Sequence, residues 1–388
     1  MQLREARQKP GLTGLVLPGG GARGAYQVGV LAGLVELCQP DVPTFPVVCG
    51  TSAGAVNAVV LASHAHDLTY AVERLASFWS QLHCARIYRT DAFTVLASSL
   101  RWFLALVSGG LLPVAPRSLL DNAPLRALLE DALRLERIET AIKTGALRGT
   151  AVTAAAYTRA SAISFFAASP DVGPWTRNRR RGERTRLHVD HIMASVALPM
   201  LFPAQRIGTE FYGDGGMRSV APLSPAIHLG ADRILVIATR DERPDPAPAA
   251  PAAYPGAGEV GGYLLDTVFM DTLNADLARL ERINRTLSLM RETQRAQTGL
   301  KLIETLVLRP SRDLREVTAE HAASMPASVK LLLRTLGGWG RDWRMASYLL
   351  FEASYCKALM DLGREDALRS AVELREFFGL GPGSADRR

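Results

Sequence analysis

The feature that most constrains this chain is a glycine-framed serine directly after an apolar run. Residues 45–49 lead into the pentapeptide Gly50-Thr51-Ser52-Ala53-Gly54, and residues 55–62 are small or apolar and contain no helix breaker. A strand that ends in Gly-x-Ser-x-Gly and passes at once into a helix is typical of a nucleophile elbow, in which the flanking glycines allow a sharp turn. The alternative is a tight strand-to-helix turn whose serine only caps the helix.

The rest of the chain alternates short apolar runs with stretches of helical periodicity. Runs of strand length lie at 15–17, 47–49, 151–158, 163–167, 234–238 and 305–310, and helical stretches at 25–38, 55–62, 71–82 and 118–135. The two strands around Arg159-Ala160 are expected to be joined by a tight turn. Alternation of strands and helices predicts an α/β fold in which helices cover a sheet.

The composition is that of a globular protein with a basic surface. The 388 residues are 48% hydrophobic and 21% charged, and the formal net charge is +7. A basic surface suits anionic partners. No nucleic-acid-binding module is visible, and aromatic residues are too sparse for a base-stacking platform. We therefore expect no nucleic-acid partner and favour peripheral contact with an anionic membrane surface.

Two further segments bear on the compartment. Residues 1–10 are polar and lack the apolar core of a secretory signal, so we expect a cytoplasmic protein. Segment 92–115 is strongly apolar, but Arg101, two glycines and a proline interrupt it, and neither half is long enough to span a bilayer. It predicts a buried helix or a lid that touches the membrane surface, and the buried helix is favoured. The cysteines show no metal or redox spacing and are expected as buried free thiols: Cys38, Cys49, Cys84 and Cys356.

We expect one large domain followed by a helical extension. Residues 241–262 are rich in Pro, Ala and Gly and predict an exposed, mobile loop, after which an amphipathic helix is expected at 263–285. Because a buried strand follows at 305–310, the loop is interpreted as an excursion within one α/β domain, residues 12–310. Residues 311–388 are expected to pack on the core as helices. These helices are predicted at 329–336, 343–362 and 365–378.

A glycine-rich loop, Gly19-Gly20-Gly21-Ala22-Arg23-Gly24, follows the first predicted strand and opens a helix. It fits the dinucleotide fingerprint weakly, because the acid sought downstream, Asp41, lies among prolines and not at a strand end. The alternative is an oxyanion loop, in which glycine N–H groups and the helix dipole face a developing negative charge. The serine elbow downstream favours the oxyanion loop. Arg23 would either hold this loop in shape or meet a lipid phosphate.

A third motif, Gly213-Asp214-Gly215-Gly216, follows the strand-like segment 210–212. An acid between glycines at a strand end can reach a site on the sheet edge, and the alternative is an ordinary β-turn. A fourth block, 194–203, reads Ala-Ser-Val-Ala-Leu-Pro and then Phe-Pro. In this order and spacing, the four blocks closely resemble the patatin-like phospholipase family, over roughly residues 12–240.

The resemblance implies a three-layer α/β sandwich with a mostly parallel central sheet, and a Ser–Asp dyad in place of a triad. Ser52 would be the nucleophile and Asp214 the general base, while backbone N–H groups of residues 19–24, around Gly20, Gly21 and Ala22, would receive the oxyanion. None of the seven histidines lies in a glycine-framed loop after Ser52, as a triad base would. Because a carboxylate is a weak base at its usual pKa of about 4, such a site must be dry. The chain departs from the family at Pro18, where members often carry Asp.

The sequence therefore predicts a carboxylic ester hydrolase of the phospholipase A or lysophospholipase type. It would cleave fatty-acyl esters of phospholipids or other acyl lipids through an acyl-enzyme, without a metal ion or cofactor. The alternatives are an acyltransferase or triacylglycerol lipase on the same site, or a non-catalytic lipid- or nucleotide-binding protein. The densest basic run, 177–186, is interpreted as a solvated loop or as a surface that meets the membrane at the site entrance. The sequence indicates neither an oligomeric state nor a head-group preference.

Overall fold

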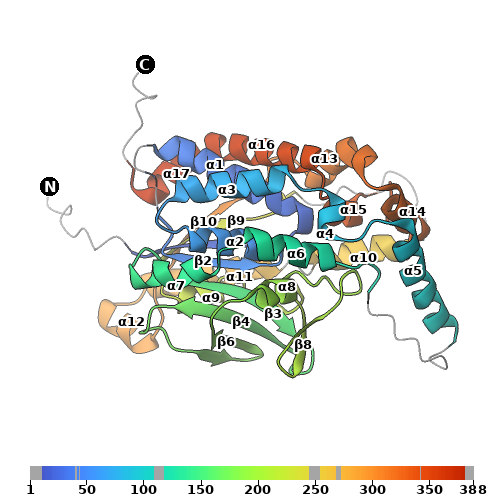
Figure 1. Ribbon diagram of the computed structural model, residues 1–388. Coiled ribbons are helices and arrows are strands. Elements are labelled where there is room, and N and C mark those ends of the chain that lie inside the picture. Colours follow the sequence, from blue (N-terminus) through green and yellow to red (C-terminus); the bar gives the residue numbers. More distant parts are fainter. Residues whose placement is uncertain are drawn as a thin grey trace, which may run out of the picture.

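The centre of the molecule is a sheet whose middle strands are parallel (Figure 1). The computed structural model describes residues 11–39, 42, 44–108, 118–243, 254–267, 272–340 and 342–380. Within these residues the strand order is β10-β9-β1-β2-β3-β4-β6-β5, and β8 pairs with both β3 and β7. The strands are β1 (Thr13–Leu17), β2 (Val47–Thr51), β3 (Gly149–Ala156), β4 (Ser161–Ala168), β5 (Trp175–Arg177), β6 (Arg180–Arg184), β7 (Gln205–Ile207), β8 (Glu210–Asp214), β9 (Arg233–Ile237) and β10 (Glu304–Leu308).

Strands β10, β9, β1, β2 and β3 run parallel to one another, and the antiparallel pairs lie on the β3–β5 side. The strand predicted at 305–310 therefore returns to the same sheet, as β10. The helices are α1 (Ala25–Cys38), α2 (Ala53–Ser63), α3 (Leu68–Ser80), α4 (Cys84–Ile87), α5 (Ala92–Val107), α6 (Ala123–Ala132), α7 (Glu136–Lys143), α8 (Val189–Ser195), α9 (Ser224–His228), α10 (Ala257–Asp266), α11 (Thr272–Ser288), α12 (Glu292–Thr298), α13 (Leu314–His321), α14 (Ala327–Thr335), α15 (Arg344–Leu349), α16 (Ala353–Arg369) and α17 (Ala371–Phe378).

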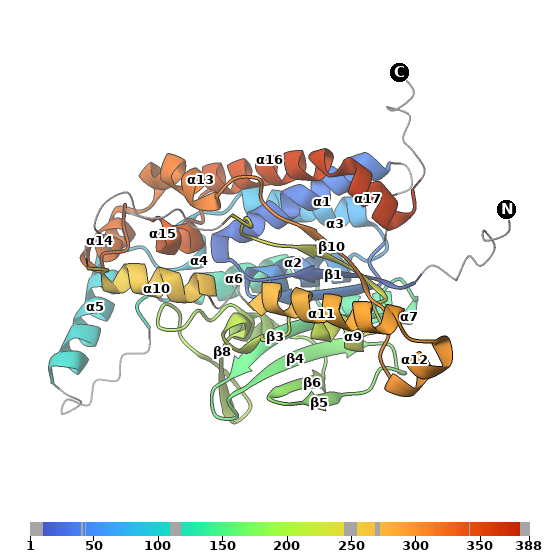
Figure 2. The same cartoon turned by 180° about the vertical axis from the view of Figure 1, so that it is seen from behind.

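Alternate side chains of the central strands enter two different cores. In β1, Leu15 and Leu17 pack in a core with residues of α1, α2, α3 and α16, whereas Val16 packs with residues of α9 and α11. Successive side chains of a strand point to opposite faces, so a central strand covered on both sides must be apolar throughout. Helices lie on both faces of the sheet (Figure 2). This arrangement confirms the predicted three-layer α/β fold.

Residues after 310 are joined to the core by α16, which lies along α1 (Figure 1). The Tyr26 hydroxyl donates to Asp366 over 3.0 Å inside this contact. At its edge, Arg364 forms an ion pair with Glu36 over 2.7 Å. The division of the chain at residue 310 stays a prediction, but the helices beyond it share one continuous core with α1.

Several element boundaries differ from those predicted. The helix expected at 118–135 is α6, followed by a further helix, α7, and α10 begins inside the stretch expected to be a loop. A non-helical segment at 350–352 separates α15 from α16, and α16 continues through 363–364, where a break was expected. Residues 244–253 of the predicted loop, residues 268–271 of the predicted helix 263–285, Asp41 and residues 1–10 lie outside the described residues.

Two surface predictions are corrected by the structure. The favoured burial of segment 92–115 is wrong for its described part, because α5 exposes Phe93, Leu96 and Val107 to 84%, 69% and 68%; residues 109–117 lie outside the described part. The basic run 177–186 is not a loop. It contributes to the antiparallel pair β5–β6 at the edge of the sheet, where arginines discourage pairing with another strand. The four cysteines are buried and free, as expected.

Candidate active site

Ser52 occupies a strained turn between β2 and α2. Its φ of 55° and ψ of −131° lie outside the regions that side-chain-bearing residues favour, and its side chain makes no cap hydrogen bond to α2. The turn is so tight that no side chain fits at either glycine. A Cβ at Gly50 would lie 2.2 Å from the Gly54 carbonyl oxygen, and one at Gly54 would lie 2.1 Å from the Leu17 carbonyl oxygen. Such strain costs about 1–3 kcal/mol and persists where the surroundings impose it. The structure therefore does not support the alternative in which Ser52 only caps α2.

Strand β3 brings Asp214 to Ser52. β2 runs along β3 as far as the pair Thr51–Thr153, and β8 approaches from the opposite direction along the same edge, ending at the pair Asp214–Ala154. The two strands thus meet end to end on β3, because β4 occupies its other edge. The residue that follows β2 and the last residue of β8 lie side by side as a result.

The Asp214 carboxyl group is fully buried. Its Oδ1 accepts a hydrogen bond from the Gly216 N–H over 2.9 Å, whereas Oδ2 has no hydrogen-bond partner among the described residues. Burial raises the pKa of Asp214 to about 7, although the Ser52 side chain and the Gly216 N–H both favour the charged form. A carboxyl group with this pKa is half ionised near neutral pH, which suits a proton acceptor.

Ser195 links the serine turn to β3, a contact that the sequence did not indicate. Its hydroxyl accepts from the Ser52 N–H over 2.9 Å and donates to the Thr153 carbonyl over 2.7 Å. The same block positions Asp214, whose N–H donates to the Ala197 carbonyl over 2.8 Å. The signal was present in the Ala-Ser-Val-Ala motif of residues 194–197, but its partners are distant in the chain. Tertiary structure alone assigns them.

The glycine loop lies beside the serine turn. It passes from β1 into a short 3-10 turn at Gly21–Gly24, and Gly21 and Ser52 line the same pocket. Gly21 has a φ of 56°, and a Cβ there would lie 2.3 Å from the Tyr348 carbonyl oxygen, so both conformation and contact require glycine. The loop residues proposed for an oxyanion site, Gly19, Gly20, Gly21, Ala22, Arg23 and Gly24, are thus brought to the serine, with all but Gly19 and Gly20 in the 3-10 turn.

A buried polar network behind the loop was missed by the sequence analysis. The Gln27 side chain donates to the Pro18 carbonyl over 2.9 Å, and the Asn57 side chain donates to the Gly24 carbonyl over 3.1 Å. Asn57 also donates to Gln27 and accepts from the Trp79 indole N–H over 2.8 Å. A fully satisfied network of this kind fixes backbone positions. It ties the glycine loop to α1, α2 and α3.

The Arg23 side chain lies in a buried ionic cluster and does not line the pocket with Ser52. Its guanidinium contacts Asp266 over 3.0 Å and donates to Ser347 Oγ, and it lies 4.2 Å from the centre of the Tyr348 ring. Asp266 also lies 3.2 Å from Arg344. The side chain of Arg23 is 2% exposed. Of the two roles considered for Arg23, the structure therefore supports a structural ion pair and excludes contact with a lipid phosphate.

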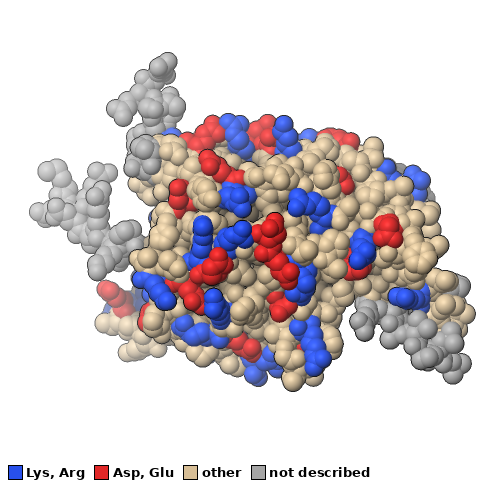
Figure 3. Space-filling model, in the orientation of Figure 1, with Lys and Arg blue, Asp and Glu red and all other residues tan. Residues whose placement is uncertain are grey.

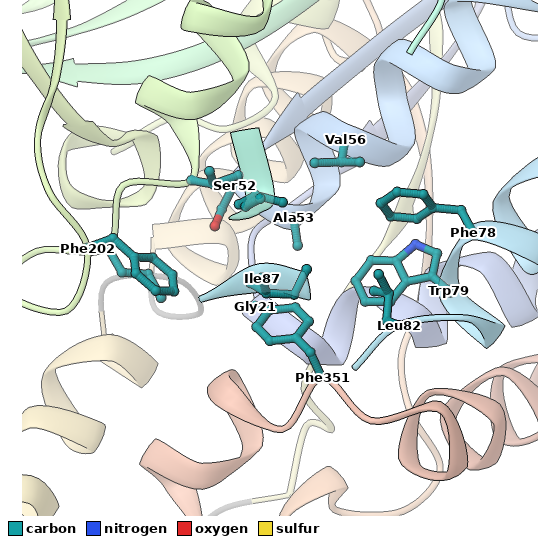
Figure 4. A pocket seen from close by; sticks show the side chains of 13 residues that line it. Gly21, Ser52, Ala53, Val56, Phe78, Trp79, Leu82, Ile87, Phe202 and Phe351 are labelled. Atoms are coloured by element: carbon teal, nitrogen blue, oxygen red, sulfur yellow. The ribbon is translucent and has the colours of Figure 1, made fainter. Parts of the chain in front are cut away.

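An apolar pocket leads from Ser52 into the protein (Figure 4). Ser52 lies at one side, with Phe202 nearby, and Phe78, Trp79 and Leu82 lie at the other. The cavity holds about 40 Å³, which is little more than one water molecule occupies. Its lining is Gly21, Ser52, Ala53, Val56, Phe78, Trp79, Leu82, Ile87, Leu125, Val196, Leu198, Phe202 and Phe351.

Among the described residues, neither a histidine nor a cluster of metal-ligating side chains lies at the pocket with Ser52. No histidine lines the pocket with Ser52. His191 is buried beside Phe165, and its Nδ1 contacts the His188 N–H over 3.0 Å.

In the described part of the chain, no three His, Cys, Asp or Glu side chains lie close enough to share a metal ion. Within the same residues, no helix is both long and apolar enough to cross a bilayer.

Comparison with known proteins places this site in a family. The model of a family described as patatin-like phospholipase matches residues 15–227, which include the glycine loop, the serine turn and the Asp-Gly-Gly motif. No curated protein matches the sequence.

Solved structures that resemble the chain share little sequence with it. VipD from Legionella pneumophila is 12% identical with a TM-score of 0.33, and covers 91% of this chain and 67% of its own. The human GIVD cytosolic phospholipase A2, in complex with methyl gamma-linolenyl fluorophosphonate and terbium chloride, is 13% identical with a TM-score of 0.43. That match covers 97% of this chain, which spans 61% of the human chain.

Proposed function

This chain belongs to the patatin-like phospholipase family, and we propose that it is a serine lipid acyl hydrolase of the phospholipase A or lysophospholipase type. The observation that carries the proposal is the meeting of Ser52 and the buried Asp214 carboxyl group beside an apolar pocket. Hydrolysis of a fatty-acyl ester needs a nucleophile, a proton acceptor and an apolar site for the chain. These two residues and this pocket supply all three.

In the proposed first step, the Ser52 hydroxyl oxygen attacks the ester carbonyl carbon while its proton passes to Asp214. The buried carboxylate is a competent base because its pKa of about 7 is raised by desolvation. Backbone N–H groups of the glycine loop would stabilise the tetrahedral oxyanion, a contribution of about 3 kcal/mol for each donor. When the carbon–oxygen bond breaks, the leaving alcohol takes the proton from Asp214, and the acyl group stays on Ser52.

In the second step, water replaces the alcohol. Asp214 takes a proton from the water, whose oxygen attacks the acyl carbon. When the bond between the acyl carbon and the Ser52 oxygen breaks, Asp214 returns this proton to Ser52 and the fatty acid is released. The pocket lining supports an acyl chain as the substrate group, because apart from Ser52 its named residues are glycine, aliphatic or aromatic. With about 40 Å³ free, the pocket must widen by side-chain movement before a fatty-acyl chain enters.

The test compares the wild-type protein with Ser52→Ala and Asp214→Asn. We expect both variants to release fatty acid from phospholipid, lysophospholipid and triacylglycerol at less than about one hundredth of the wild-type rate. A fluorophosphonate probe should label wild type and not Ser52→Ala. The matched control is Ser63→Ala, which removes another buried hydroxyl from α2, where Ser63 donates to the Val59 carbonyl. Folded wild-type protein that is not labelled, or equal loss in the control, would overturn the proposal.

A further inference from the structure

Helix α5 carries an exposed apolar stripe. Among its described residues, the exposed large apolar side chains are Phe93 (84% exposed), Leu96 (69%), Leu100 (52%), Leu104 (37%) and Val107 (68%). Successive residues are about 100° apart around a helix, so these five lie within a sector of about 80°. Val95, on the opposite side, is buried. The five side chains thus form an apolar stripe on one face of α5, and the first turn of the helix buries its opposite face.

The charge of α5 and its neighbour is of one sign. The α5 segment contains Arg101 and no acidic residue, and α14 contains Lys330 and Arg334 and no acidic residue. The two helices adjoin (Figures 1 and 2), and the Ser328 hydroxyl of α14 donates to the Thr90 carbonyl just before α5. In the space-filling view, mixed positive and negative charges crowd the middle of this face of the molecule (Figure 3). Apolar and cationic groups together complement an anionic lipid surface.

The helix is also continuous with the wall of the pocket. Ile87, the last residue of α4, lines the pocket with Ser52, and α5 begins at Ala92. Asp91 lies between them and fixes the start of α5, because its carboxylate accepts from the Thr94 N–H over 2.8 Å. A surface that held the start of α5 would therefore lie near the wall of the pocket that contains Ser52.

We propose that the apolar stripe of α5, with the cations of α5 and α14, docks this protein on an anionic phospholipid bilayer. The proposal rests on the lipid acyl hydrolase function proposed above. With 16 residues, α5 is too short to span the hydrocarbon core, so it lies in the plane of the interface with Leu96 and Leu100 toward the acyl chains. Arg101, Lys330 and Arg334 contact lipid phosphates at the rim.

The test measures co-sedimentation of the full-length protein with vesicles, in the Ser52→Ala background so that no lipid is consumed. Vesicles of phosphatidylcholine containing phosphatidylglycerol are compared with phosphatidylcholine alone. We expect Leu96→Ser/Leu100→Ser to lower the partition coefficient on anionic vesicles by at least about tenfold. Replacing Arg101, Lys330 and Arg334 by Gln should weaken binding to anionic vesicles by about fivefold for each cation and leave binding to neutral vesicles unchanged.

The matched control is Leu289→Ser/Val372→Ser. These two apolar side chains are 84% and 63% exposed and lie near α12 and on α17, at the opposite end of the molecule from α5 (Figure 1). The control should bind as wild type does. Equal loss in control and α5 variant, or no vesicle binding by the parent protein, would overturn the proposal. It would also be overturned if the α5 substitutions left vesicle binding unchanged and instead dissolved a dimer in gel filtration.

Hydrolysis of a short soluble ester separates this proposal from the proposed function. With Ser52 intact, the α5 double variant should retain wild-type activity on that ester while losing activity on anionic vesicles. Absence of Ser52-dependent ester hydrolysis in the wild-type protein would overturn the enzymatic proposal. The vesicle measurements in the Ser52→Ala background would still decide whether α5 docks on lipid.

Discussion

The pKa values of two buried aspartates in this protein are shifted in opposite directions. Asp214, beside Ser52, is 0% exposed, and Asp266, beside Arg23, is 2% exposed. Burial acts to raise the pKa of both. At Asp214 no cation opposes it, and the pKa rises to about 7. At Asp266 the charges of Arg23, Arg240 and Arg344, with the Tyr348 hydroxyl, outweigh burial and hold the pKa below its ordinary value.

Neighbouring groups, and not burial alone, decide what a buried carboxyl group can do. A carboxylate surrounded by cations is a poor base, because its proton affinity has been lowered. A carboxyl group that is buried beside neutral hydrogen-bond donors, with no cation among its neighbours, keeps a high proton affinity at the expense of stability. Asp266 suits the anchoring of the glycine loop through Arg23, and Asp214 suits proton transfer.

The largest expected effect is that of Asp214→Asn on activity, accompanied by a gain in stability. Removing the proposed base should lower hydrolysis of a soluble ester by about 10²–10⁴-fold. Raising a carboxyl pKa from 3.8 to about 7 means that the folded state loses stability as pH rises through that range. Above pH 7 the cost is about 4 kcal/mol, which Asn removes. Urea unfolding at pH 8 should show a more stable variant; a less stable one would contradict the comparison.

The same substitution at Asp266 should act in the opposite sense. Asp266→Asn leaves Arg23, Arg240 and Arg344 without their shared carboxylate, and loss of one partner from a buried ion pair costs about 3–5 kcal/mol. Because the pKa of Asp266 is lowered, its stabilisation is present above its unfolded-state pKa and is lost as pH falls through the folded-state value. Urea unfolding at pH 8 measures the loss, with the exposed Asp361→Asn as control. Equal stability of the two variants would refute the assigned role.

The pH profile of the wild-type enzyme should report the pKa of Asp214 and be independent of Asp266. As Asp214 must be ionised to accept a proton, kcat/KM should rise about tenfold for each pH unit below the pKa, pass its midpoint at about pH 7 and level off above it. Asp266→Asn should lower the plateau and leave the midpoint in place, because Asp266 does not contact Asp214. Stopped assays of a soluble ester across pH 5–9 would reveal the midpoint. A midpoint close to 4 would mean that Asp214 is not desolvated in solution.

The smallest effect is expected at Ser195, which holds the serine turn beside Asp214. Ser195→Ala leaves the buried Ser52 N–H without its acceptor, a loss of about 1–3 kcal/mol. Activity should fall about tenfold or more, with the midpoint of the pH profile unchanged, because the serine turn is loosened while Asp214 keeps its surroundings. Ser164→Ala is the control, since that hydroxyl contacts Thr153 Oγ1 and not the turn. Equal losses of activity would show that Ser195 has no particular role.

The sequence predicted the architecture because its signals were local. Each central strand is a short apolar run, because a strand that is buried on both faces needs apolar side chains at successive positions. The glycines of the serine turn likewise reported a close backbone approach that any side chain would block. Segment 92–115 misled for the same reason, since an apolar helix has the same composition whether it faces a core or a solvent-exposed surface.

The sequence by itself determined the strand-turn-helix units, the three-layer fold and the residues that could carry chemistry. Only tertiary structure decided that Arg23 faces Asp266 instead of the site, that Ser195 holds the serine turn, and that α5 is exposed. The pKa of Asp214 belongs to this second group. A proton affinity depends on desolvation and on charges brought together from distant parts of the chain, and no local pattern records them.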